Sequence, residues 1–293
     1  MMRTNLKDAL RCGYDLLVGQ KSAPWDFDRI GSEDLMLGKA APTKAAVAKR
    51  DLSCTPGYTR DDLAKVPEGS NMGLGCGNPV PAASLKAGEF VLDLGSGAGL
   101  DCFLAAEMVG PKGKAMGLDL SRGMASLARS LAVECGYQNV TFCLGDIEAL
   151  PFRDSSMDAV ISNCAINLVP DKKKAFKEAF RVLKPGGRLS TCDIVLVGRL
   201  PKSVRNAIKE GLGALPSPES KEGYLGIMSS CGFAEVDIIS ESPFPAECMA
   251  EDISGRAIQG SSKITSEDLK EIGRTILSLG IRAVKSGSAL NKR

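Results

Sequence analysis

Short apolar segments alternate with amphipathic segments through the middle of the chain. Apolar runs at 90–94, 114–119, 140–144, 158–163 and 187–195 predict strands, because they are short and bounded by turn residues. The segments between them at 100–108, 121–135 and 171–183 have the helical spacing of apolar residues. Strands that alternate with helices are typical of βαβ units. The pattern therefore predicts an α/β fold with a doubly wound, mostly parallel sheet of the seven-stranded type.

The segments on either side of this core differ from it. Residues 1 to about 70 are polar and interrupted by prolines, which predicts a lid-like N-terminal arm with short helices, one of them starting at Thr59. Residues 71–200 form the expected core. Beyond it we expect helices at 201–215 and 221–230, a strand at 234–239 and an amphipathic helix at about 266–285. Residues 201–293 are expected to form a substrate-binding region and tail.

Composition and charge exclude several classes of partner. The chain has 293 residues, a formal net charge of +2 and 5% aromatic residues. Such a chain offers neither a basic surface nor many stacking platforms for nucleic acid or anionic membranes. Its first residues lack the apolar core of a signal peptide, and no apolar run approaches the roughly 20 residues that span a bilayer. We therefore expect a cytoplasmic protein without nucleic-acid or membrane partners.

Cysteine is abundant and histidine is absent. The chain has ten cysteines, none in a Cys-x-x-Cys pair, and no histidine. This excludes zinc sites that use histidine, leaves a four-cysteine site without its usual spacing, and excludes Ser–His and Cys–His catalytic pairs. No metal site is predicted, and most of the thiols are expected to be small buried hydrophobic groups.

The turn after the first predicted strand carries the clearest chemical signal. It reads Asp93-Leu-Gly-Ser-Gly-Ala-Gly99 and leads into a predicted helix. Glycines let the backbone approach a ligand closely, and the helix N-terminus faces that ligand. The next strand ends in Asp119, where an acid can accept both hydroxyls of a ribose. The acid inside the strand end and the spacing of the glycines indicate the Rossmann-like form found in S-adenosylmethionine (SAM) methyltransferases.

We expect the SAM site to form at the C-terminal ends of successive strands. Around the amino-acid part of SAM we place Asp93, Gly95, Ser96, Gly97 and Gly99, with the Asp93 carboxylate near the ammonium group. Leu120 and Met124 follow Asp119 and can flank the adenine. Asp146 and Ile147 end the third strand, where Asp146 can accept from the adenine amino group; the alternative is that Asp146 is a turn or N-cap residue.

The fourth strand ends in Asn163-Cys164, where the transferred methyl group should point. Methyl transfer from a sulfonium is an in-line displacement that mainly requires an aligned nucleophile. A thiolate is a soft ligand for metals and metalloids, which makes Cys164 a candidate catalytic residue beside Asn163. Asn163 is also placed in the SAM site. The alternative for Cys164 is a buried core thiol.

Several motifs resemble those of arsenite methyltransferases. They are Asn71-Met-Gly-Leu-Gly-Cys-Gly-Asn-Pro79, the sequence Asp101-Cys-Phe-Leu-Ala-Ala106 after the glycine turn, and Ser162-Asn-Cys-Ala-Ile-Asn-Leu168. The resemblance covers about residues 54 to 240. It implies methyl transfer from SAM to trivalent arsenic held by cysteine thiolates, with Cys164 and Cys54 as the matching ligands. It also implies a thiol reductant such as glutathione or thioredoxin as a partner.

One position departs from the family motif. The family's third cysteine opens a Cys-x-x-Gly-Ala-Leu motif, and here Glu210 stands at that place. A carboxylate oxygen is a hard ligand and replaces a thiolate on arsenic poorly. An alternative is therefore a methyltransferase on the same scaffold that methylates a small organic acceptor at sulfur, nitrogen or oxygen.

Overall fold

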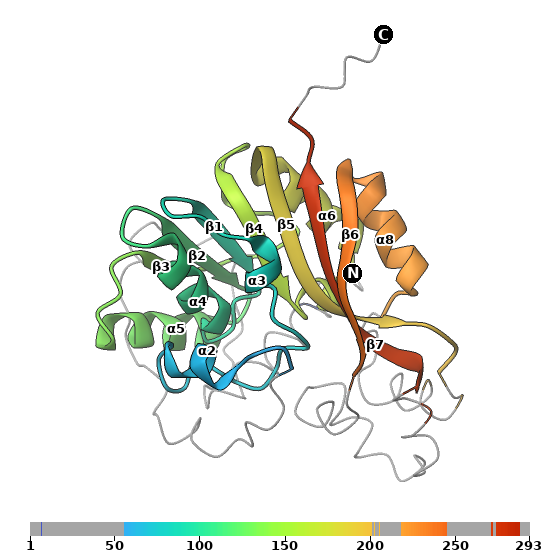
Figure 1. Ribbon diagram of the computed structural model, residues 1–293, viewed down its shortest axis with the longest axis horizontal. Helices are drawn as coiled ribbons and strands as arrows, with labels where there is room; N and C mark the ends of the chain where they lie inside the picture. The colour runs from blue at the N-terminus through green and yellow to red at the C-terminus, as the bar shows by residue number, and fades with distance from the viewer. Residues whose placement is uncertain are drawn as a thin grey trace.

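The structure is a computed structural model that describes residues 56–200, 218–244 and 274–287, together with Lys7, Lys202, Arg205 and Glu271. Its strands are β1 (Phe90–Leu94), β2 (Lys114–Asp119), β3 (Val140–Leu144), β4 (Met157–Asn163), β5 (Leu183–Leu196), β6 (Phe233–Pro243) and β7 (Ile276–Lys285). They form one sheet in the order β3-β2-β1-β4-β5-β7-β6, which runs across the described part of the molecule (Figure 1).

The sheet is mostly parallel. Strand β1 pairs in parallel with β2 and β4, β2 with β3, and β4 with β5, whereas β7 is antiparallel to both β5 and β6. The five strands predicted in the core and the strand at 234–239 are confirmed, with ends that differ by a few residues. From the β1–β4 pair, chain order runs outward as β1, β2, β3 on one side and as β4, β5 on the other. Ligands bind at such a switch point in open α/β sheets.

Helices cover both faces of the sheet. They are α2 (Arg60–Ala64), α3 (Val80–Ala83), α4 (Leu100–Val109), α5 (Arg122–Glu134), α6 (Lys172–Val182) and α8 (Lys221–Ser230), with a short 3₁₀ helix η3 (Ile166–Leu168). Residues of α3, α4 and α5 share one buried apolar cluster, and residues of α6 and α8 share another. Thr59 forms a capping box at the start of α2, as its sequence predicts. The predicted helix at 201–215 lies almost wholly outside the described residues.

The predicted C-terminal helix is wrong from Ile276 onward. Residues Ile276–Lys285 form β7, which lies between β5 and β6 and is buried along most of its length. A strand that is covered on both faces has a nearly continuous apolar sequence, which resembles that of a buried helix. Pairing with β5 and β6 decides between the two, and both partners are remote in sequence from β7.

Two buried ionisable side chains, one on each face of the sheet, join neighbouring elements to strand β5. The Arg188 guanidinium of β5 pairs with Glu89 at 2.5 Å and donates to the carbonyl oxygens of Ala83 and Ser84, which fixes the end of α3. On the other face, Asp193 of β5 is fully buried and accepts from the Tyr224 hydroxyl of α8 at 2.5 Å. Asp193 thus anchors α8 to the sheet.

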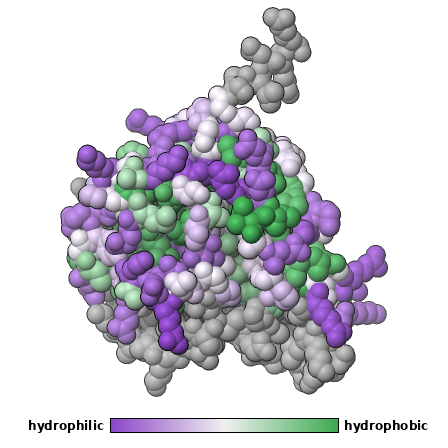
Figure 2. All heavy atoms as spheres, in the orientation of Figure 1, coloured by the Kyte–Doolittle hydropathy of each residue, from purple (hydrophilic) through white to green (hydrophobic). Residues whose placement is uncertain are grey.

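The surface of the described part is mixed in character. Polar residues are spread over the face seen in Figure 2, with smaller groups of hydrophobic residues between them. None of the helices in the part of the chain that the structure describes is long and apolar enough to cross a bilayer.

Candidate active site

A cavity lies at the switch point of the sheet. It is lined by the segments that follow β1, β2, β3 and β4, and by part of the stretch before α3. Of the residues predicted to bind SAM, those on its wall are Asp93, Gly95, Ser96, Gly97, Asp119, Leu120, Met124, Asp146, Ile147 and Asn163. Gly99 is not among the lining residues; it precedes α4, where a Cβ would lie 2.6 Å from the Phe142 ring.

The glycine turn is shaped for close approach to a ligand. Gly95 has a φ of 72°, and a Cβ there would lie 2.3 Å from the Ala165 Cβ. A side chain at this position is therefore excluded both by the backbone and by the segment after β4. Next to it, the buried Ser96 Oγ has no hydrogen-bond partner among the described residues. A buried hydroxyl without a partner indicates a missing ligand group or water.

The acids at the ends of β2 and β3 are held by backbone groups. Asp119 accepts from the Gly97 and Ser121 N–H groups, each at 2.8 Å, so its carboxylate is fixed beside the glycine turn. Asp146 accepts from the Glu148 N–H at 2.9 Å and forms an ion pair with Lys7, which also lines the cavity. Asp146 is thus both a turn residue and a cavity residue.

Two carboxyl groups on the cavity wall, those of Asp93 and Asp101, are buried. Burial, together with the neighbouring carboxylates of Asp101 and Asp119, raises the pKa of Asp93 well above its ordinary value. Burial raises the pKa of Asp101 to about 6, against the opposing effect of hydrogen bonds from Tyr58 and Asn163. A cation placed here would favour the charged forms of these groups, because opposite charge stabilises a buried carboxylate.

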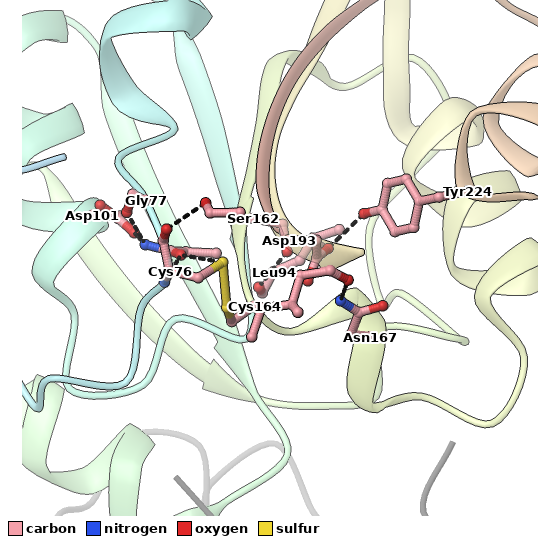
Figure 3. Close-up of a disulfide and its surroundings, with 12 residues drawn as sticks. Cys76, Gly77, Leu94, Asp101, Ser162, Cys164, Asn167, Asp193 and Tyr224 are labelled. Carbon is pink, nitrogen blue, oxygen red and sulfur yellow. Dashed lines mark hydrogen bonds between the residues drawn. A yellow bond between two sulfur atoms is a disulfide. The ribbon is translucent and has the colours of Figure 1, made fainter. Parts of the chain in front are cut away.

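Two cysteines that are remote in sequence meet beside the cavity. Cys76 and Cys164 are separated by 88 residues and form a disulfide, drawn in yellow in Figure 3. Cys164 lines the cavity, and Cys76 is fully buried behind it. Gly75 and Gly77 flank Cys76, and each approaches the sheet closely: a Cβ on Gly77 would lie 2.7 Å from the Cys192 Sγ. The two glycines let the backbone carry Cys76 onto the ends of β4 and β5.

The Asn163 side chain connects this thiol pair to the buried acids. Its Oδ1 accepts from the Cys76 N–H at 3.0 Å. Its Nδ2 donates to the Tyr58 hydroxyl at 2.8 Å, to the Gly77 carbonyl at 2.7 Å and to Asp101 at 3.2 Å. The Tyr58 hydroxyl in turn donates to Asp101 at 2.6 Å.

Comparison with known proteins identifies the family. Residues 85–224 match the family described as "Methyltransferase domain". The crystal structure of CrArsM, an arsenic(III) S-adenosylmethionine methyltransferase from Chlamydomonas reinhardtii, superposes with a TM-score of 0.63 and 32% identity. The match covers 80% of this chain and 76% of that one. The chain belongs to the arsenite methyltransferase family.

Curated arsenite methyltransferases match a shorter part of the chain. The relative from Halobacterium salinarum is 43% identical over 182 residues, which are 62% of this chain and 46% of that protein. The human relative is 41% identical over 140 residues, which are 45% of this chain and 37% of that protein. The chain therefore spans less than half the length of these two arsenite methyltransferases.

Family resemblance predicted part of the thiol site and missed part of it. Cys164 lines the cavity, and its role as an arsenic ligand stays a prediction, whereas Cys54 and Glu210 lie outside the described residues. Cys76 belongs to a motif that carries the resemblance, but only the structure reveals it as the partner of Cys164. The glycines on either side of Cys76 are the sequence signal that could have identified it.

None of the remaining described cysteines lines the cavity. Cys102 and Cys192 are buried, and burial raises the pKa of each thiol above its ordinary value, as it raises that of Cys143 to about 11. Cys135 is exposed at the end of α5. Within the described ranges, no group of three or more Cys, Asp or Glu side chains is arranged to hold a metal ion.

Proposed function

We propose that this chain is a SAM-dependent methyltransferase that methylates trivalent arsenic held by cysteine thiolates. The observation that carries the proposal is the pairing of Cys76 with Cys164 beside the cavity at the switch point. Two thiols that can form a disulfide can also bridge one soft metalloid, because thiolates prefer such ligands. The thiol pair favours this substrate over an organic acceptor.

The cavity residues suit SAM as the methyl donor. The Asp119 carboxylate is placed for a ribose, the unpartnered Ser96 Oγ for a polar group, and Asp93 for the ammonium group, whose charge would offset the cost of burying a carboxylate. Bound SAM supplies an electrophilic methyl group on a sulfonium. The chain's own contribution is to hold the acceptor in line with that methyl group and to exclude water.

The thiols act as ligands in a balanced exchange. A thiol reductant, such as glutathione or thioredoxin, first converts the disulfide to two thiols and is itself oxidised. Cys76 and Cys164 then replace two hydroxyl groups of arsenous acid, and each thiol proton leaves with a hydroxide as water. The arsenic keeps its lone pair, which is the nucleophile for the methyl carbon. Such chemistry needs no general base and suits arsenic detoxification in the cytoplasm.

Formation of S-adenosylhomocysteine tests the proposal. The full chain is incubated with SAM and reduced glutathione, with and without arsenite. We expect product only with arsenite, loss of that product in Cys164→Ser, and unchanged SAM binding in the variant. Cys135→Ser is the matched control, because Cys135 is an exposed free cysteine at the end of α5. Arsenite-dependent product from Cys164→Ser at the rate of the unmodified chain would contradict the ligand role.

A further inference from the structure

The two thiols of the Cys76–Cys164 pair have different surroundings. Cys164 is partly exposed and lines the cavity, whereas Cys76 is fully buried and does not line it. Cys164 has a φ of 56°, so the chain turns sharply after β4. Its N–H donates to the Cys192 carbonyl at 2.8 Å, which stabilises this left-handed turn. The turn presents Cys164 to any molecule in the cavity.

Cys76 is held from its other side by the Asn163 amide. The Asn163 Oδ1 accepts from the Cys76 N–H at 3.0 Å and lies 3.8 Å from the Cys76 Sγ. An amide oxygen at this place can accept from the S–H group of the reduced Cys76. The backbone bond does not involve the sulfur, so it remains when the disulfide is reduced.

The orientation of the Asn163 amide is itself fixed. Its Nδ2 donates to the Gly77 carbonyl and to the Tyr58 hydroxyl, so the oxygen of the amide has to face Cys76. Burial and the Asp101 carboxylate raise the pKa of Tyr58 well above its ordinary value, so its hydroxyl stays protonated and donates to Asp101. These contacts place Cys76 from three elements: the segment before α2, the start of α4 and the end of β4.

We propose that Asn163 is a positioning residue that gives the two thiols, Cys76 and Cys164, different roles. It holds Cys76 buried as the second ligand and leaves Cys164 as the thiol that an incoming metalloid meets first. The identity of the metalloid rests on the proposed function. The order of the two thiols is a property of the protein alone and can be measured without SAM or arsenite.

The test is the rate of alkylation at each cysteine. The full chain is reduced with a phosphine, the phosphine is removed, and the thiols react with iodoacetamide for increasing times before digestion and mass spectrometry. Cys76 can react only after local opening, so we expect it to be modified at least about tenfold more slowly than Cys164. Equal rates, or faster reaction at Cys76, would overturn the proposal.

Two variants distinguish a specific positioning of Cys76 by Asn163 from a general loss of local stability. Asn163→Ala should raise the rate at Cys76, and Tyr58→Phe should raise it less, because only one of the contacts to the amide is lost. The buried Cys102 in α4 is an internal reporter whose rate should not change. Tyr137→Phe is the matched control, since the Tyr137 hydroxyl donates to the Lys65 carbonyl oxygen and neither residue lines the cavity.

The outcomes separate this inference from the proposed function. If both variants leave the Cys76 rate unchanged, or raise the Cys102 rate equally, Asn163 has no specific positioning role. If Asn163→Ala does not fold, Tyr58→Phe alone decides. Slower alkylation of Cys76 without arsenite-dependent turnover would support the order of the two thiols and contradict the proposed substrate. Arsenite-dependent turnover with equal alkylation rates would support the substrate and contradict the order of the thiols.

Discussion

The buried carboxyl group of Asp193 should make the stability of this protein depend on pH near neutrality. Asp193 is fully buried, and its Oδ2 accepts from the Tyr224 hydroxyl. Burial raises its pKa from 3.8 to about 7, although the hydrogen bond from Tyr224 and the charge of Lys172 act in the opposite direction.

The size of the effect follows from this shift. Between pH 3.8 and pH 7 the folded protein keeps a proton on Asp193 that the unfolded chain releases. The free energy of unfolding therefore falls as pH rises through this range, by about 1.4 kcal/mol per pH unit, and reaches a loss of about 4 kcal/mol above it. About 2 kcal/mol of the loss falls between pH 5.5 and pH 8.

Asp193→Asn isolates this contribution, because asparagine is neutral at every pH and can still accept from Tyr224. Urea unfolding followed by circular dichroism should give a stability difference between variant and unmodified chain that grows by about 2 kcal/mol from pH 5.5 to pH 8. The exposed Asp237 on β6 provides the control Asp237→Asn, for which the difference should be flat. A flat difference for Asp193→Asn as well would mean that the folded protein ionises this group normally.

Three further substitutions test other parts of the structure. Asp119→Ala should lower SAM affinity by about 1–3 kcal/mol in titration calorimetry; unchanged affinity would place the cofactor elsewhere. Gly95→Ala puts a Cβ 2.3 Å from another Cβ, whereas Gly88→Ala has the same left-handed backbone with no atom within 4 Å. The first should therefore cost about 1–3 kcal/mol more unfolding free energy than the second in urea, and equal losses would refute the steric argument. Arg188→Met leaves Glu89 partly buried without its partner and should cost about 3–5 kcal/mol; a loss of about 0–1 kcal/mol, typical of exposed pairs, would contradict the importance of burial.

The local pattern of apolar and turn residues was sufficient to predict most of the strands and helices of the core. Strands β1 to β5 and helices α4 to α6 follow from runs of apolar residues and their turn residues, which act within a few positions of one another. Strand β7 could not be predicted in this way, because its conformation depends on β5 and β6 on either side of it. An apolar run takes the structure that its neighbours allow.

The candidate site also contains some residues that the local sequence pattern predicts and some contacts that it does not. The glycine turn, Asp119 and Asp146 follow directly after predicted strands, so a parallel sheet brings them to one edge. The contact between Cys76 and Cys164 spans 88 residues, and the bonds of Asn163 reach Tyr58 in a segment before the sheet begins. Such long-range pairings depend on the path of the backbone over the sheet, which no local pattern records.

The disulfide between Cys76 and Cys164 also links the reactivity of the protein to its stability. It closes a loop of 88 residues that contains β1, β2, β3 and β4. Closing a loop of that length restricts the denatured chain by about 4–5 kcal/mol in the chain-entropy description. The oxidised protein should therefore be more stable against unfolding than the form in which both thiols are free. The melting temperature measured with and without reductant would show how much of a preparation has both thiols reduced and able to bind a substrate.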